Sequence, residues 1–177
     1  MEIFSVGDRQ SICDTFSRLL RDMAREEKLR ELLETQSGFD AQLWETMSEL
    51  GLTGIIIDAE YGGVGGGAVE IEALMECAGE YLYSGPFVST CVIAPVILGA
   101  CETNAVAARH LSDITQGKAI FSVAACGEDG DWSQSPKVNA QRSGEGWLLS
   151  GGASFVSHAA IANRCLVYAN TDSGTAV

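Results

Sequence analysis

Residues 146–158 read GWLLSGGASFVSH, and their pattern gives the second part of the chain its β-rich character. Trp147–Leu149 predicts one strand and Ser154–Ser157 predicts the next, because a glycine pair between them permits a tight or bulged backbone. A flat cofactor could lie against the edge of such a strand pair. The alternative is a plain β-hairpin core in which Trp147 and Phe155 only pack, since aromatic residues are common in strands.

Further strand patterns surround this stretch. The strand pattern at residues 120–124 is followed by a polar loop at Gly127–Asp131. The segment Ser143–Gly146 is typical of a hairpin turn. The predicted strands are residues 120–124, 138–143, 146–150, 164–169 and 175–177.

The first part of the chain has helical periodicity instead. Apolar residues recur at three- and four-residue steps over Asp8–Glu34, which predicts a long amphipathic helix bent near Glu27. Asp40 is positioned to cap the N-terminus of the next helix, and Gly51 to end it. Further helices are predicted over residues 69–81, 88–100 and 104–116, of which the second is apolar nearly all round and contains Pro95.

These patterns predict an α+β fold with two domains. An all-helical domain over residues 1–117 is followed by an incomplete antiparallel β-domain over residues 118–177. The last predicted strand begins and then stops, which would leave an unpaired apolar edge. We therefore expect the β-domain to be completed by more chain or by a partner, in a homo- or hetero-oligomer.

Composition limits the partners and the compartment. The net charge of −13 disfavours a nucleic-acid partner or an anionic membrane surface. The longest apolar run, Val88–Ala100, is too short to span a bilayer, so we expect no membrane insertion. The six cysteines form no C-x-x-C pair and only two histidines accompany them, so we assign no metal ligands and expect the reducing cytoplasm.

A glycine cluster offers a different function. Residues 63–68 read GVGGGA, which satisfies the G-x-G-x-x-A pattern of a dinucleotide-binding turn between a strand-like run and a helix. The context is poor, because three residues separate the apolar run from the glycines and no acidic residue stands where it would hold a ribose hydroxyl. A flexible connection between helices is the preferred interpretation, with a nicotinamide site as the less favoured one.

Several of these motifs taken together resemble the acyl-CoA dehydrogenase family. The family is built from an N-terminal helical domain, a central β-domain and a C-terminal four-helix domain. The matching segments are LWETMSELGL at residues 43–52, EYGGVG at 60–65, SGPF at 84–87, GKA at 117–119, GWLLSG at 146–151 and FVS at 155–157. Each is weak alone, and the set is specific.

The resemblance implies an FAD-dependent α,β-dehydrogenation of an acyl-CoA thioester. In the family a glutamate removes the α-proton, the β-hydride passes to the flavin, and the electrons go on to an electron-transfer flavoprotein. By resemblance, Phe121, Val123 and Ala124 would line the pyrimidine side of the flavin, and Phe155, Val156 and Ser157 would flank its ring, with the Ser157 hydroxyl near N5. Gly130 and Asp131 would face the substrate.

The sequence also departs from the family pattern. The usual Thr-Glu-Pro is replaced by Ala124-Ala125-Cys126, and the usual Gly-Ser-Asp by Asp129-Gly130-Asp131, so one hydroxyl for the flavin and one for the substrate are missing. The resemblance places the catalytic base in the C-terminal domain, and no residue from 1 to 177 is assigned as that base. An alternative function is therefore a non-catalytic subunit that pairs with an active relative.

Overall fold

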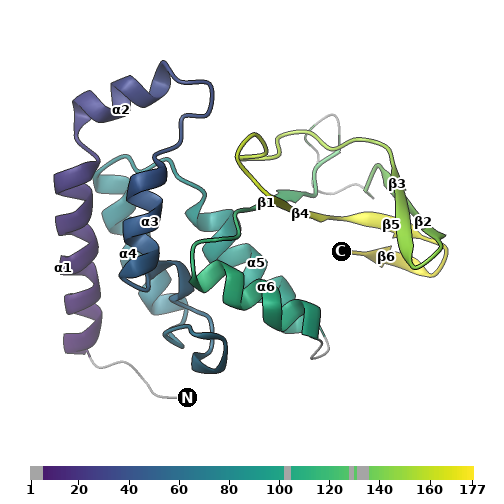
Figure 1. The fold of residues 1–177 in the computed structure, drawn as a ribbon, viewed down its shortest axis with the longest axis horizontal. Coiled ribbons are helices and arrows are strands. Elements are labelled where there is room, and N and C mark those ends of the chain that lie inside the picture. The colour runs from purple at the N-terminus through teal and green to yellow at the C-terminus, as the bar shows by residue number, and fades with distance from the viewer. Residues whose placement is uncertain (1–5, 102–104, 128–129, 131–135) are drawn as a thin grey trace. The chain divides into compact units, whose positions relative to one another are not determined.

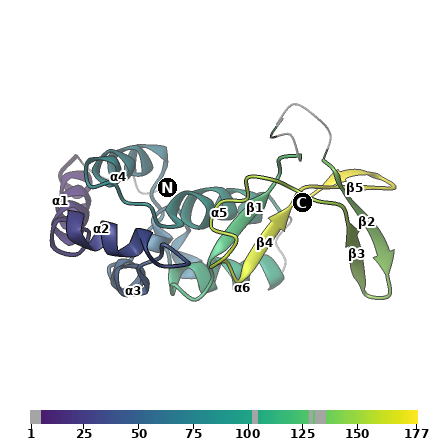
Figure 2. The ribbon, with the colours of Figure 1, turned by 90° about the horizontal axis from the view of Figure 1, so that it is seen from above.

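The computed structural model describes residues 6–101, 105–127, 130 and 136–177. The chain divides into two compact units, residues 1–120 and 121–177. Among the described residues, the first unit contains helices and the second contains strands, as Figures 1 and 2 show. The α+β fold predicted from the sequence is confirmed.

The helical unit begins with two helices where the sequence predicted one bent helix. α1 spans Val6–Met23 and α2 spans Glu26–Leu33. The backbone is extended at Arg25, with φ −67° and ψ 151°, so the helix is interrupted rather than bent. The following elements are α3 (Ala41–Glu49), η1 (Leu52–Gly54), η2 (Ala59–Tyr61), α4 (Ala68–Glu80), η3 (Val88–Ile93), α5 (Ala94–Ala100) and α6 (Ala105–Thr115).

The core of the helical unit joins side chains from nearly all of these elements. Phe16 of α1 stacks on Phe87, with ring centroids 6.3 Å apart, and contacts Tyr83 edge-on. The fully buried side chains of this unit include Phe16, Leu20, Met47, Thr53, Ile55, Leu74, Phe87, Thr90, Cys91 and Ile114. Burial raises the pKa of the Cys91 thiol well above its ordinary value, so this cysteine is an inert core residue.

The predicted cap of α3 is confirmed. The Asp40 side chain accepts a hydrogen bond from the Leu43 amide at 3.0 Å, and Gly51 adopts the left-handed conformation just beyond the helix, with φ 75°. Both features satisfy backbone groups that a helix end leaves without partners.

We expect Asp40→Ala to lower the free energy of unfolding by about 1 kcal/mol, because the Leu43 amide would lose its acceptor. Urea denaturation followed by circular dichroism measures the change. Asp40→Asn keeps an acceptor oxygen and should lie within about 0.5 kcal/mol of the wild type. Equal losses in the two variants would show that the cap does not stabilise this helix.

The apolar segment 88–100 is less buried than its composition suggested. It begins as a π-helix, η3, and continues as α5, whose first turn holds Pro95, where a missing N–H costs no helical hydrogen bond. Cys91, Ala94 and Leu98 are buried, whereas Val88 and Val96 are exposed. One side of this segment therefore presents apolar surface to the outside of the helical unit.

The described residues of the β unit form two small sheets. β1 (Phe121–Ala124) pairs with β4 (Arg164–Val167), and the second sheet has the order β3-β2-β5-β6, from Gly146–Ser150, Val138–Ser143, Ala169–Thr171 and Gly174–Ala176. The predicted hairpin is confirmed, with Ser143 opposite Gly146. Val138, Ala140 and Ala169 form its small core, against which Val167 packs.

Two details of the predicted β-domain are wrong. The pairing is not wholly antiparallel, because β1 with β4 and β2 with β5 are parallel. β4 and β5 are separated only by Tyr168, so one nearly continuous segment of chain pairs first with β1 and then with β2. The predicted strand Ser154–Ser157 does not form, because Gly151, Phe155 and His158 have φ values of 124°, 56° and 59°, which interrupt a pleated backbone.

Candidate functional site

The candidate flavin residues of β1 are largely covered. Phe121 and Ala124 are buried and Val123 is half-buried. The Ala124 carbonyl accepts a hydrogen bond from the Tyr168 amide at 3.0 Å, which continues the parallel pairing with β4 past the end of the strand. Direct side-chain contact with a ligand is therefore open to Val123, whereas Phe121 and Ala124 shape the strand beneath it.

The candidate residues after β3 are more accessible. Phe155 is 77% exposed, Ser157 is exposed and Val156 is half-buried. A positive φ is uncommon for a large residue such as Phe155, and it turns the side chain away from the direction that a strand would give it. An exposed aromatic ring held by a strained backbone is a feature that a ligand contact would explain.

The structure brings this segment together with the loop that follows β1. The Ser154 amide donates a hydrogen bond to the Cys126 carbonyl at 3.2 Å. A Cβ atom placed on Gly130 would lie 2.8 Å from Cε2 of Phe155, so the ring rests directly on this glycine. Gly130 and Phe155, two predicted site residues that are 25 positions apart in the sequence, are therefore neighbours; Asp131 lies outside the described residues.

Cys126 contacts the loop that follows β1. Its side chain is buried, and its thiol lies 3.9 Å from the Gly130 carbonyl, a long and weak hydrogen bond. The Gly130 amide donates a hydrogen bond to the Gly127 carbonyl at 3.0 Å. Gly127 and Gly130 are thus held together although the sequence lacks the hydroxyl and proline that the family pattern has there.

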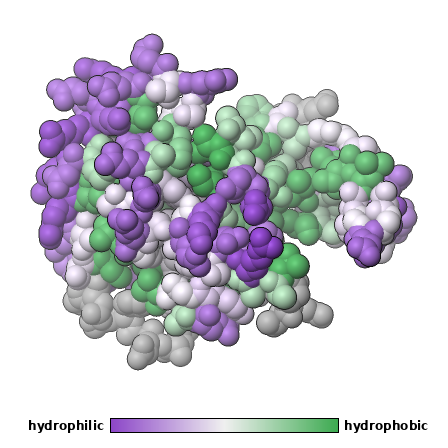
Figure 3. Space-filling view, viewed as in Figure 1, coloured by the Kyte–Doolittle hydropathy of each residue, from purple (hydrophilic) through white to green (hydrophobic). Residues whose placement is uncertain are grey.

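Trp147 takes no part in the core of the β unit. It is 50% exposed, and the Arg142 guanidinium lies over its ring, with Cζ 4.5 Å from the ring centroid. Every residue of β3 is exposed, including Leu148 and Leu149. The interpretation in which Trp147 and Phe155 only fill a hairpin core does not describe this surface, and Figure 3 shows hydrophobic residues on the visible surface of the β unit.

The glycine cluster is a closed turn and not a phosphate cradle. No strand precedes it among residues 54–62, where the backbone forms η1, η2 and turns. Its amides are already bonded within the chain: those of residues 62–66 donate to the carbonyls of residues 59, 58, 54, 57 and 55 in turn, and that of Gly67 donates to the Glu70 carboxylate at 2.7 Å. A dinucleotide-binding turn needs such amides free for the pyrophosphate, so this geometry argues against a nicotinamide site here.

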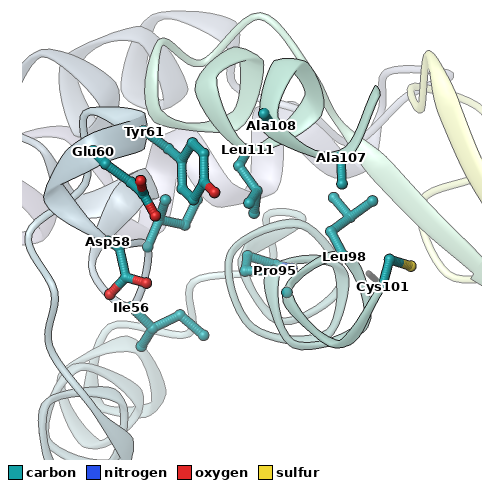
Figure 4. Close-up of a pocket in the computed structure, with 12 residues that line it drawn as sticks. Ile56, Asp58, Glu60, Tyr61, Pro95, Leu98, Cys101, Ala107, Ala108 and Leu111 are labelled. Carbon is teal, nitrogen blue, oxygen red and sulfur yellow. The ribbon is translucent and has the colours of Figure 1, made fainter. Parts of the chain in front are cut away.

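The helical unit contains a pocket beside the apolar segment 88–100. It has a volume of about 300 Å³ and lies between the 56–61 segment and helices α5 and α6 (Figure 4). Asp58, Glu60 and Tyr61 form one side, and Pro95, Leu98 and Leu111 form an apolar side. A hydrogen bond with Glu60 raises the pKa of the Tyr61 phenol. Ala107 and Ala108 of α6 also line the pocket.

Comparisons with known proteins agree with the architecture. The family model described as acyl-CoA dehydrogenase, N-terminal domain, matches residues 8–118. Acyl-CoA dehydrogenase FadE27 of Mycobacterium tuberculosis is 30% identical over 151 residues, which cover 85% of this chain and 39% of that protein. The chain belongs to the acyl-CoA dehydrogenase family.

Two solved structures are also similar. The ChsE4-ChsE5 complex from Mycobacterium tuberculosis matches with a TM-score of 0.86 and 26% identity, over 100% of this chain and 48% of that chain. The steroid acyl-CoA dehydrogenase variant Tcur3481-Tcur3483 G363A matches with a TM-score of 0.85 and 26% identity, over 96% and 46%. The chain therefore spans less than half the length of these relatives.

Within the residues that the structure describes, none of the helices is both long enough and apolar enough to cross a membrane.

Proposed function

We propose that this chain supplies part of an FAD site that dehydrogenates an acyl-CoA thioester at the α,β position. The observation that carries the proposal is the packing of the loop after β1 on Phe155, two segments that the family pattern assigns to substrate and flavin. Membership of the family gives the reaction class. The activity belongs to a longer chain or to an assembly, because the relatives are more than twice as long.

The described residues fit a flat, partly polar ligand. The exposed Phe155 ring offers an aromatic face, Val123 and Val156 offer aliphatic contacts, and Ser157 offers a hydroxyl that donates or accepts. Bound FAD would supply the acceptor for the β-hydride. The chain's own residues would hold and orient the ring and keep water from it, while the proton acceptor would come from elsewhere in the protein.

The proposed substrate is an acyl-CoA with a bulky acyl group. Gly130 lies in the loop that the family directs to the substrate, and Asp131 remains a proposed contact. A steroid acyl-CoA dehydrogenase is among the similar structures, which supports ring-bearing groups within this class.

The proposed partners are an acceptor such as an electron-transfer flavoprotein and further subunits in a homo- or hetero-oligomer. The ChsE4-ChsE5 structure is a complex of two proteins, which supports pairing with a second chain. The exposed apolar side chains of β3 are suited to such contact. The proposed compartment is the cytoplasm, in keeping with cysteines that form no disulfide bond in the described units.

A second candidate function is a non-catalytic subunit that pairs with an active relative. It is favoured by the Ala124-Ala125-Cys126 sequence, which lacks the family's flavin-binding hydroxyl. The two candidates differ in one measurable property: the catalytic candidate binds FAD through Phe155 and Ser157, and the non-catalytic one does not.

We expect Phe155→Ala and Ser157→Ala each to weaken FAD binding by roughly 3- to 10-fold, through loss of an aromatic face and of a hydrogen bond respectively. Fluorescence titration of FAD against the protein expressed from its complete reading frame measures both dissociation constants. Ser150→Ala is the matched control, since it removes an exposed hydroxyl from the end of β3. Unchanged affinity in both site variants would contradict the assigned flavin contacts.

A further inference from the structure

Two cysteines of the helical unit meet where α1 packs on α4. Cys13 lies on α1 and Cys77 lies on α4, 64 positions later in the sequence, and both are half-buried. The Cys77 thiol lies 4.0 Å from the Cys13 carbonyl oxygen, and both cysteines line the same hollow.

The surroundings of the pair give each sulfur a different role. The Ser17 hydroxyl donates a hydrogen bond to the Cys77 sulfur at 3.2 Å. Burial and then the neighbouring Cys77 raise the pKa of the Cys13 thiol. The Ser17 hydroxyl is therefore placed to hydrogen-bond the Cys77 sulfur when that sulfur attacks a disulfide. Cys77 is thus suited to attack first and Cys13 to follow.

A hollow beside the pair gives access from outside. It has a volume of about 440 Å³, and it is lined by both cysteines together with Arg9, Ser17 and Glu76. A small-molecule disulfide therefore has room to reach the sulfurs. The other cysteines differ, since Cys91 is fully buried and Cys101 is exposed without a second thiol beside it in the described structure.

We propose that Cys13 and Cys77 form a reversible dithiol site, which low-molecular-weight disulfides oxidise to a bond between α1 and α4. The Cys77 thiolate attacks one sulfur of glutathione disulfide, whose S–S bond breaks and releases one glutathione thiolate. The Cys13 thiolate then attacks the Cys77 sulfur of the mixed disulfide and releases the second glutathione. Two protein thiols are oxidised, one glutathione disulfide is reduced to two thiols, and the two protons pass to the leaving thiolates.

The consequence of oxidation is a covalent link across the α1–α4 interface. Such a link removes freedom from the unfolded chain, so it stabilises the folded helical unit. In a reducing compartment the bond would form only under oxidising conditions and would reverse when thiols return. The site makes the stability of this unit dependent on the thiol–disulfide balance, independently of flavin or substrate.

The test is oxidation of the wild-type protein with glutathione disulfide, followed by peptide mass mapping without reduction. We expect one peptide pair that joins Cys13 to Cys77, at the mass of the two peptides less two hydrogens, which disappears after dithiothreitol. The oxidised protein should melt at least about 5 °C higher than the reduced protein. Ser17→Ala should slow the reaction severalfold, because the Cys77 sulfur loses its hydrogen-bond donor.

Two variants act as controls. Cys13→Ser should stop at a mixed disulfide of Cys77 with glutathione, whereas Cys101→Ser should still form the linked pair. Wild-type protein that carries glutathione on both cysteines, keeps both thiols free, or joins either of them to another cysteine would overturn the proposal. Because mapping of the wild type alone decides among these outcomes, poor folding of a variant does not affect the conclusion.

Discussion

Gly63→Ala is expected to destabilise the helical unit by at least about 3 kcal/mol. A Cβ atom at this position would lie 1.9 Å from the Ile57 carbonyl oxygen, far inside the sum of atomic radii. That carbonyl also accepts the Gly65 amide at 2.9 Å, so relief of the clash would open the turn. The backbone of the Tyr61–Gly66 turn cannot move aside, because neighbouring amides bind carbonyls of residues 54–59.

Chemical denaturation of Gly63→Ala, followed by the circular dichroism of the helices, measures the loss. Gly79→Ala is the matched control: Gly79 lies within α4 with nothing within 4 Å of the added carbon, so alanine should be neutral or should stabilise by up to about 1 kcal/mol. Equal stability of Gly63→Ala and the wild type would mean that the turn is not built as the structure shows.

Gly151→Ala is expected to disrupt the β unit by a comparable amount, at least about 3 kcal/mol. Its φ is 124°, and an added Cβ would lie 2.1 Å from the Lys137 carbonyl oxygen and 3.0 Å from Cα of Val138. Gly151 lies directly against the backbone of Lys137 and Val138, at the point where β3 ends and the segment that leads to Phe155 begins. We therefore expect loss of both the β2–β3 pairing and the contact between Phe155 and Gly130.

Hydrogen exchange with mass spectrometry locates this effect. Amides of residues 138–150 should exchange much faster in Gly151→Ala, while protection in α3 and α4 stays unchanged. Gly174→Ala is the control that separates the effect of a strained φ from the effect of a steric clash. Gly174 has a similar φ of 126°, but an added Cβ there would meet no atom within 4 Å. Equal exchange rates in the two variants would show that the close approach to Lys137 has no structural role.

Local rules predicted the parts of the fold that depend on neighbouring residues. The Asp40 cap, the Gly51 stop and the hairpin at Ser143–Gly146 each rest on a few adjacent positions, and all three are present. The predicted strand Ser154–Ser157 failed because its β-prone residues are overridden by a tertiary constraint. Gly151 passes close to Lys137, and the chain then turns through left-handed conformations.

Contacts between segments that are distant in the sequence could not be predicted from it. Parallel pairing of β1 with β4 joins residues more than 40 positions apart, and no local pattern distinguishes it from antiparallel pairing. The glycine cluster shows the opposite problem, because GVGGGA fits a nucleotide-binding pattern while its amides are used by the 54–59 carbonyls. The glycine motif shows only which backbone conformations are allowed. Whether its amides could bind a phosphate depends on their hydrogen-bond partners, which the motif does not show.

The candidate site, too, was predicted only in part from the sequence. The family resemblance directed attention to Phe155, Ser157 and Gly130, and the structure adds that the Phe155 ring rests on Gly130. This contact also accounts for the missing serine, because a side chain at position 130 would meet the ring and would be strained at φ 76°. The 56–61 side of the pocket beside α5 and α6 could not be predicted from the sequence, since it depends on how separate helices pack.

The central claim is that these residues belong to a flavin-dependent acyl-CoA dehydrogenase site. The most direct measurement is the visible absorption spectrum of the protein expressed from its complete reading frame, before and after anaerobic addition of an acyl-CoA thioester. We predict a yellow protein that carries FAD and whose flavin absorbance bleaches when the thioester is added. A colourless protein that takes up no FAD would contradict the claim.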